Sequence, residues 1–142
     1  MRMDVNGWLA TAAAMSAVAS LLHVAVIVGG PAWYRFFGAG ERMARLAEAG
    51  SPIPTVVTLA IAAMLALWAA YAAAGAGLLK PLPFTAAALV AITSVYVLRG
   101  LVAVPVMALP ALRTPFNFWS SAICLAIGCV HVVGLWQVWK RI

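Results

Sequence analysis

The chain has 142 residues, the length of a single domain. Hydrophobic residues make up 66% of it and charged residues only 8%, whereas a soluble domain is about 45–50% apolar and about 25% charged. Lipid must therefore cover most of the surface, which excludes an ordinary soluble domain. The net charge of +6 does not indicate nucleic-acid binding, because the basic residues are scattered at helix ends and in loops. Membrane lipids, whose phosphates lie at these positions, are the expected partners.

Four apolar segments reach the length of about 20 residues that a membrane-spanning helix needs. Prolines mark their ends: Pro31 follows the first segment, Pro105 follows the third, and Pro115 suits the first position of the fourth. Thr114 can cap that last helix. The sequence therefore predicts an all-α polytopic membrane protein, an up-down four-helix transmembrane bundle in which residues 1–142 form one domain. The expected spans are 8–29, 55–75, 84–104 and 115–139.

The connection between the first two spans, residues 30–54, carries two of the chain's three carboxylates. Glu41 and Arg45 stand at i,i+4, and Arg45 and Glu48 at i,i+3, a spacing that supports ion pairs on a helix. This pattern predicts a short amphipathic helix in the membrane interface, ended by Gly50. We expect this connection, called loop 1 below, to act as a lid over one end of the bundle.

Four spans place both chain ends on the same side of the membrane. The basic residues do not decide which side this is, since Arg2, Lys80, Lys140 and Arg141 lie on it and Arg35, Arg42, Arg45, Arg99 and Arg113 lie opposite. Lys140 and Arg141 directly follow the last span, so we expect the termini in the cytoplasm. The pattern resembles that of small four-span bacterial membrane proteins in general, without a family motif. The bacterial inner membrane is therefore the expected location.

Polar residues from all four spans fall at a similar depth on the side of loop 1. His23 lies six residues before Gly29, and Arg99 five before Val104. At about 1.5 Å per residue, both lie roughly 8 Å below the same membrane face. The sequence therefore predicts a ligand-binding pocket beneath loop 1, with Tyr34 and Tyr96 lining its mouth. The pocket is formed by His23, Tyr34, Glu41, Glu48, Tyr96, Arg99, Asn117 and Ser120.

Arg99 is the strongest single signal for that pocket. An arginine inside a span costs about 2.5–3.5 kcal/mol on insertion scales, so it usually faces the bundle and has a partner. Its planar guanidinium binds both oxygens of a phosphate or carboxylate. We expect Arg99 and His23 to hold the polar end of a small amphiphile of the lipid, quinone or isoprenoid type. The structural alternatives are snorkelling to the headgroups or an ion pair with Glu41 or Glu48.

Two further functions stay open. A membrane-embedded enzyme acting on a lipidic substrate would use His23 or Glu41 as acid or base and Arg99 as electrostatic stabiliser. A structural subunit or homo-oligomer would use its polar groups only to fix helix register. It would pack through small-residue faces at Ala13, Ala17 and Ser20 and at Ser120, Cys124 and Gly128.

The sequence predicts no metal site and leaves the cofactor open. Haem ligation by His23 and His131 is disfavoured, because the predicted spans separate them by roughly 12 Å along the membrane normal. Copper binding by Cys124 and His131 lacks a ligand spacing that would support it. Cys124 and Cys129 point roughly 140° apart on one helix and cannot form a disulfide with each other.

Overall fold

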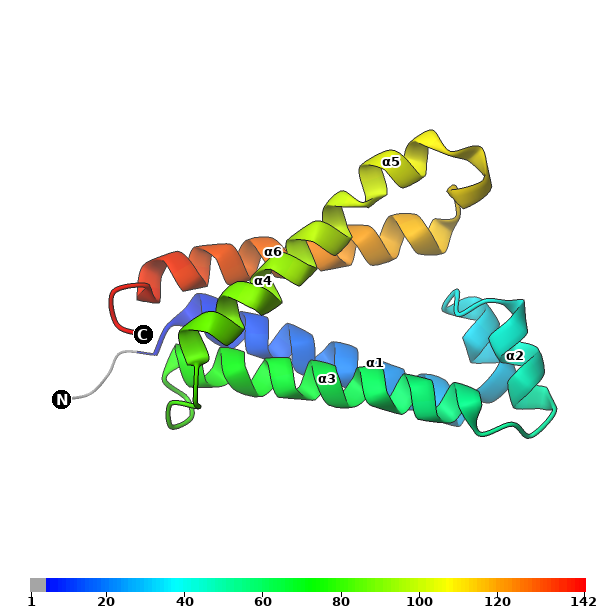
Figure 1. The fold of residues 1–142 in the computed structure, drawn as a ribbon, viewed down its shortest axis with the longest axis horizontal. Coiled ribbons are helices and arrows are strands. Elements are labelled where there is room, and N and C mark those ends of the chain that lie inside the picture. Colours follow the sequence, from blue (N-terminus) through cyan, green and yellow to red (C-terminus); the bar gives the residue numbers. More distant parts are fainter. Residues whose placement is uncertain (1–4) are drawn as a thin grey trace. The chain divides into compact units, whose positions relative to one another are not determined.

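The computed structural model describes residues 5–142, apart from the side chains of Ala103, Val106, Met107 and Ala111. Arg2, which entered the count of basic residues, lies outside the described residues. The described chain is all helical (Figure 1), as the sequence predicts. Its elements in order are α1 (Gly7–Phe36), α2 (Glu41–Glu48), α3 (Ile53–Ala76), α4 (Thr85–Leu101), α5 (Ala103–Ala108), the 3₁₀ turn η1 (Pro110–Leu112) and α6 (Pro115–Val138).

Three of these helices, α1, α3 and α6, are long and apolar enough to cross a membrane. The fourth predicted span is shorter than expected, because α4 has 17 residues and ends at Leu101. Placing the end of this helix at Val104, directly before Pro105, was wrong. Pro105 instead lies in the first turn of α5, where proline is tolerated because the backbone N–H groups have no partner within the helix.

The first helix also differs from its predicted span. It does not end at Gly29 but continues to Phe36 after a kink. The kink lies at Gly30, whose φ of 65° and ψ of −151° are non-helical. Glycine adopts this conformation readily because it lacks a Cβ. Pro31 then begins the final turns, where its fixed φ suits a helix start.

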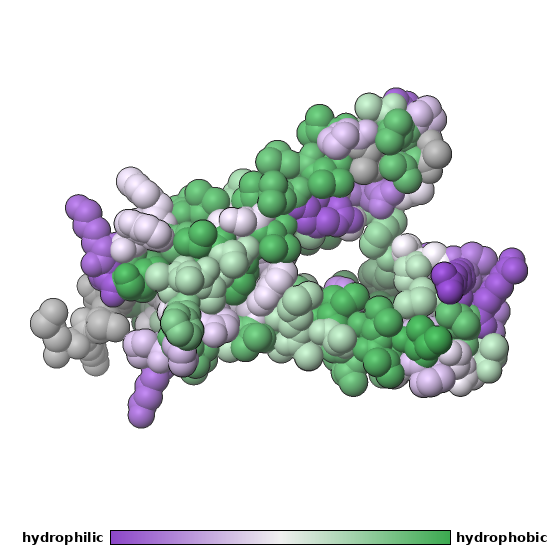
Figure 2. Space-filling model, viewed as in Figure 1, coloured by the Kyte–Doolittle hydropathy of each residue, from purple (hydrophilic) through white to green (hydrophobic). Residues whose placement is uncertain are grey.

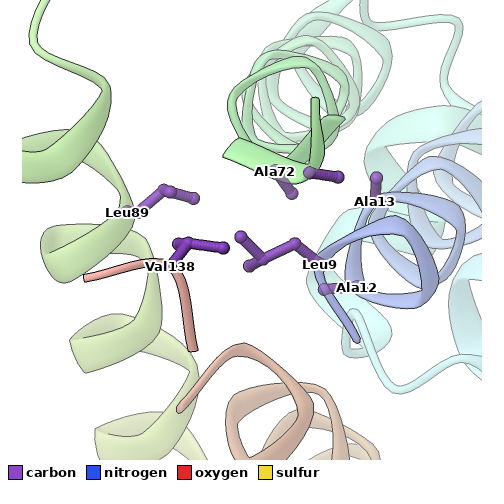
Figure 3. Packing of buried hydrophobic residues seen from close by; sticks show 7 residues of the cluster. Leu9, Ala12, Ala13, Ala72, Leu89 and Val138 are labelled. Atoms are coloured by element: carbon purple, nitrogen blue, oxygen red, sulfur yellow. The ribbon is translucent and has the colours of Figure 1, made fainter. Parts of the chain in front are cut away.

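The chain divides into two compact units, each described here by itself. Unit 1 comprises the described residues 5–16 and 68–142, and unit 2 comprises residues 17–67. The core of unit 1 gathers around Leu9 of α1, Leu89 of α4 and Val138 at the end of α6, which point toward one another (Figure 3). Small alanines of α1 and α3 complete it: Ala12, Ala13, Ala72 and Ala76.

Within unit 1, α4 and α6 pack closely through glycines. A Cβ built on Gly100 would lie 2.7 Å from the Cα of Leu125, and one on Gly128 would lie 3.0 Å from the backbone nitrogen of Val97. Such approaches of backbone to backbone are possible only where a side chain is missing. Gly128, a member of the predicted small-residue face, therefore serves packing inside the chain.

Unit 2 contains the predicted loop 1 helix as α2. Its apolar face packs against α1, where Ala44 is fully buried with Val26 and Tyr34. Met43 and Ala47 pack against the same cluster. The polar face of α2 is exposed, and hydrophilic side chains gather over this helix (Figure 2). The sequence thus located the helix correctly, and the structure shows that the chain itself covers its apolar face.

Candidate functional site

The candidate site lies in unit 1, where Arg99 of α4 meets the second turn of α6. The guanidinium donates two hydrogen bonds, from Nη1 to the hydroxyl of Ser121 (2.7 Å) and from Nη2 to that of Ser120 (3.0 Å). Ser121 is buried, while Ser120 and Arg99 are half-buried. Two adjacent hydroxyls therefore fix the orientation of the arginine fork. The sequence places both serines at the depth of Arg99, but the predicted site included only Ser120.

The described part of unit 1, residues 5–16 and 68–142, contains no aspartate or glutamate that could neutralise Arg99. The described ion pairs join Arg35 to Glu41, Arg35 to Glu48 and Arg45 to Glu41, all within unit 2. The remaining carboxylate belongs to Asp4, which lies outside the described residues. Arg99 is thus held by neutral oxygen atoms, and both described glutamates already have an arginine partner.

Asn117 and Thr114 build the start of α6, which carries the two serines. The Thr114 hydroxyl accepts from the backbone N–H of Asn117 (3.1 Å), the helix cap that the sequence predicts. The Asn117 side-chain amide donates to the carbonyl oxygen of Leu112 (2.8 Å), and the backbone carbonyl oxygen of Asn117 accepts from the Ser120 hydroxyl (3.3 Å). Asn117 therefore positions the serine end of α6.

Tyr96 belongs to a buried cluster one turn from Arg99. Its hydroxyl shares a hydrogen bond of 2.9 Å with that of Ser16. Its ring lies 5.2 Å from the imidazole of His131 and 5.1 Å from the indole of Trp68, measured between centroids. Tyr96 is 4% exposed and His131 fully buried, so both residues lie in the core of unit 1. The predicted position of Tyr96 at a pocket mouth finds no support in these contacts.

His131 has one satisfied ring nitrogen and one that is not. Nδ1 lies 3.0 Å from the carbonyl oxygen of Ile127, one turn earlier in α6. Nε2 is buried without a hydrogen-bond partner among the described residues. A metal would need several ligands, and the described residues contain no group of three or more His, Cys, Asp or Glu side chains that could hold one.

His23 lies in unit 2, so the structure does not test the predicted pocket shared by His23 and Arg99. Its Nδ1 atom is 2.8 Å from the carbonyl oxygen of Ala19, and the side chain is half-buried. The neighbouring Ser20 donates to the carbonyl oxygen of Ala62 in α3 (2.7 Å). His23 and His131 also belong to different units. The structure therefore does not test haem ligation by this pair, which the sequence disfavours.

The two loop 1 glutamates form an ion-pair cluster around Arg35, a residue that sequence reasoning did not assign to the site. Arg35 Nε lies 2.9 Å from Glu41 and Nη1 lies 2.8 Å from Glu48, while Arg45 Nε lies 3.1 Å from Glu41. Hydrogen bonds from Arg35 and Arg45 lower the pKa of Glu41 from 4.5 to about 2. A carboxylate held so firmly in its charged form is a poor proton acceptor at neutral pH. The geometry favours a structural role for Glu41 over catalysis.

Tyr34 lies beneath this cluster in unit 2. It is 2% exposed, and its hydroxyl has no hydrogen-bond partner among the described residues. The side chain packs with Val26 and Ala44 and joins the end of α1 to α2. Tyr34 therefore belongs to the core of loop 1, although the sequence placed it at the mouth of a pocket.

The fold and the site together define a helical, membrane-type protein with an arginine that is fixed by two serines in a unit whose described residues include no aspartate or glutamate. No family model, no curated protein and no solved structure matches this chain.

Proposed function

We propose that this chain is an integral membrane protein that binds the anionic headgroup of a small amphiphile at Arg99. In this proposal the helices form a four-helix transmembrane bundle in the bacterial inner membrane, with both termini in the cytoplasm. The observation that carries it is the state of Arg99, which is fixed by two neutral hydroxyls in a unit whose described residues include no aspartate or glutamate.

The charge of Arg99 in an apolar helix favours an anionic ligand. A guanidinium in an apolar helix such as α4 costs about 2.5–3.5 kcal/mol on insertion scales, and this cost falls when an anion lies nearby. Ser120 and Ser121 supply hydrogen-bond acceptors but no negative charge. The described part of unit 1 supplies no counter-charge, and in this proposal the ligand brings it. In a bilayer, the abundant anions are phosphate and carboxylate headgroups.

The geometry of the Arg99 guanidinium also favours an anionic ligand. A guanidinium has five N–H donors, and the two serines use two of them. Three donors remain for an incoming anion. Because the fork is already held in one orientation by α6, less side-chain entropy is lost when the anion binds. This arrangement suits a phosphate or carboxylate group carried by an amphiphile. The proposal depends on unit 1 alone and is independent of where His23 lies.

Native mass spectrometry of the purified protein, followed by lipid analysis, tests the proposal. We expect an anionic amphiphile to co-purify with the wild-type protein and to be lost in Arg99→Gln. Arg42→Gln is the matched control, because Arg42 is an exposed arginine of α2 that takes part in none of the described ion pairs. The control should keep the amphiphile. Equal retention by wild type and Arg99→Gln, or the same loss in both variants, would contradict the proposal.

A further inference from the structure

A shallow apolar groove runs along unit 1 at the C-terminal end of α6. Thr93 of α4 and Val132, Leu135 and Trp136 of α6 line it, together with Trp139 directly after the helix. The two tryptophans are large exposed apolar side chains, Trp136 at 78% and Trp139 at 56%. Thr93 is the one lining residue with a side-chain hydroxyl, and this oxygen is itself buried. The groove therefore offers almost no polar group to an occupant.

The residues change from apolar to basic directly after Trp139. Lys140 and Arg141 follow Trp139, and both are exposed. The backbone N–H of Arg141 donates to the carbonyl oxygen of Val138 (2.7 Å), which folds the basic pair back into a turn at the helix end. Neither residue takes part in the ion pairs of the described chain, and both described glutamates lie in unit 2. Two positive charges thus directly follow Trp139, the last residue that lines the groove.

This order of residues matches the layers of a lipid molecule. Tryptophan concentrates at the level of the headgroups, and basic residues just beyond a span attract anionic lipids. The apolar groove suits an acyl chain, and the basic turn suits the phosphate of the same molecule. A zwitterionic lipid would satisfy the groove but would bring no net negative charge to the turn.

We propose that this groove binds an anionic phospholipid, with an acyl chain along Val132, Leu135 and Trp136 and the phosphate at Lys140 and Arg141. The site is separate from the one at Arg99 and does not depend on the function proposed for it. Arg99 lies in the last turn of α4, whereas the basic pair follows the end of α6.

The experiment compares two lipids with identical acyl chains, dioleoyl-phosphatidylglycerol and dioleoyl-phosphatidylcholine, titrated into the full-length protein in detergent and counted by native mass spectrometry. We expect wild type to prefer the anionic lipid. Each basic residue contributes about fivefold to this preference, a factor that corresponds to the attraction of one Lys or Arg to an anionic surface. Lys140→Gln/Arg141→Gln should remove the part of the preference that the basic turn provides, and Arg99→Gln should keep that part.

A second variant tests the acyl-chain half of the proposal. Trp136→Ala/Trp139→Ala should weaken the binding of both lipids while leaving the ratio between them unchanged. An unchanged preference in the Lys140→Gln/Arg141→Gln variant overturns the proposal, as does unaltered binding in the tryptophan variant. If wild type binds no amphiphile through Arg99 but still prefers the anionic lipid through Lys140 and Arg141, the function proposed for Arg99 fails and the groove site is supported.

Discussion

Arg35 and Arg99 are the same residue type placed in opposite chemical settings. Arg35, at the end of α1, meets two carboxylates at an exposed position and is fully paired. Arg99, in the apolar helix α4, meets two serine hydroxyls, and the described part of its unit contains no aspartate or glutamate. The comparison shows that Glu41 and Glu48 fasten loop 1 through Arg35, while two hydroxyl oxygens hold Arg99 within unit 1. This difference is the basis for proposing a structural role for the ion pairs of loop 1 and a binding role for Arg99.

The largest expected effect is a loss of stability when the packing of α4 against α6 is disrupted. In Gly128→Ala the new methyl group would meet the backbone of Val97, so α4 and α6 must move apart. Overpacking of this kind costs about 1–3 kcal/mol of stability. Unfolding by denaturing detergent in mixed micelles measures it. Gly7→Ala is the matched control, because a Cβ there meets nothing within 4 Å. Equal stability of the two variants would mean that the helices do not pack through Gly128.

The next prediction separates the orientation of Arg99 from its charge. Ser120→Ala/Ser121→Ala removes both acceptors but keeps the guanidinium. We expect the variant to retain the amphiphile with an affinity lowered by about 1 kcal/mol, roughly fivefold, because the fork must be ordered when the anion binds. Lipid titration followed by native mass spectrometry gives the affinity. Complete loss, as strong as in Arg99→Gln, would show that the serines contact the ligand themselves.

Much of this fold could be predicted from the sequence, because it depends on local signals. Thr114 and Pro115 determine the start of α6, and the alternation of Glu41, Arg45 and Glu48 predicts α2. The continuation of α1 past Gly30 was missed, since a Gly-Gly-Pro sequence is equally compatible with an end and with a kink.

The site was predictable only in part. Its central residue follows from composition alone, because an arginine inside an apolar helix is rare. Its partners depend on how α4 and α6 are rotated about their axes, which Gly100 and Gly128 help to determine and helical spacing does not reveal. The pairing of Arg35 with both glutamates depends in the same way on the kink at Gly30, which places the last turns of α1 beside α2.

A smaller effect, on amide exchange in α2, should follow from removing the ion pairs of Arg35 in loop 1. Arg35→Gln removes the ion pairs to both glutamates, so we expect the backbone amides of α2 to exchange with deuterium several-fold faster. The helix should stay folded, because Ala44 still packs on Val26 and Tyr34, and exposed ion pairs contribute little to stability. Hydrogen–deuterium exchange with mass spectrometry measures the change, and Arg42→Gln is the control on the same helix. Exchange that is as slow as in wild type would show that the apolar contacts alone hold α2.

The smallest effect concerns the charge of Glu41. Hydrogen bonds from Arg35 and Arg45 lower its pKa from 4.5 to about 2. A pKa lower in the folded state means that the ion pairs stabilise loop 1 fully above the ordinary pKa of a glutamate. That stabilisation is lost as the pH falls toward 2, and neutral pH leaves it intact. Titration of the side-chain carboxyl ¹³C shift in micelles should show the low value in wild type and a rise toward the ordinary range in Arg35→Gln. An ordinary pKa of Glu41 in both proteins would mean that Arg35 does not pair with this carboxylate in solution. The contrast between a structural Arg35 and a ligand-binding Arg99 would then fail on the side of Arg35.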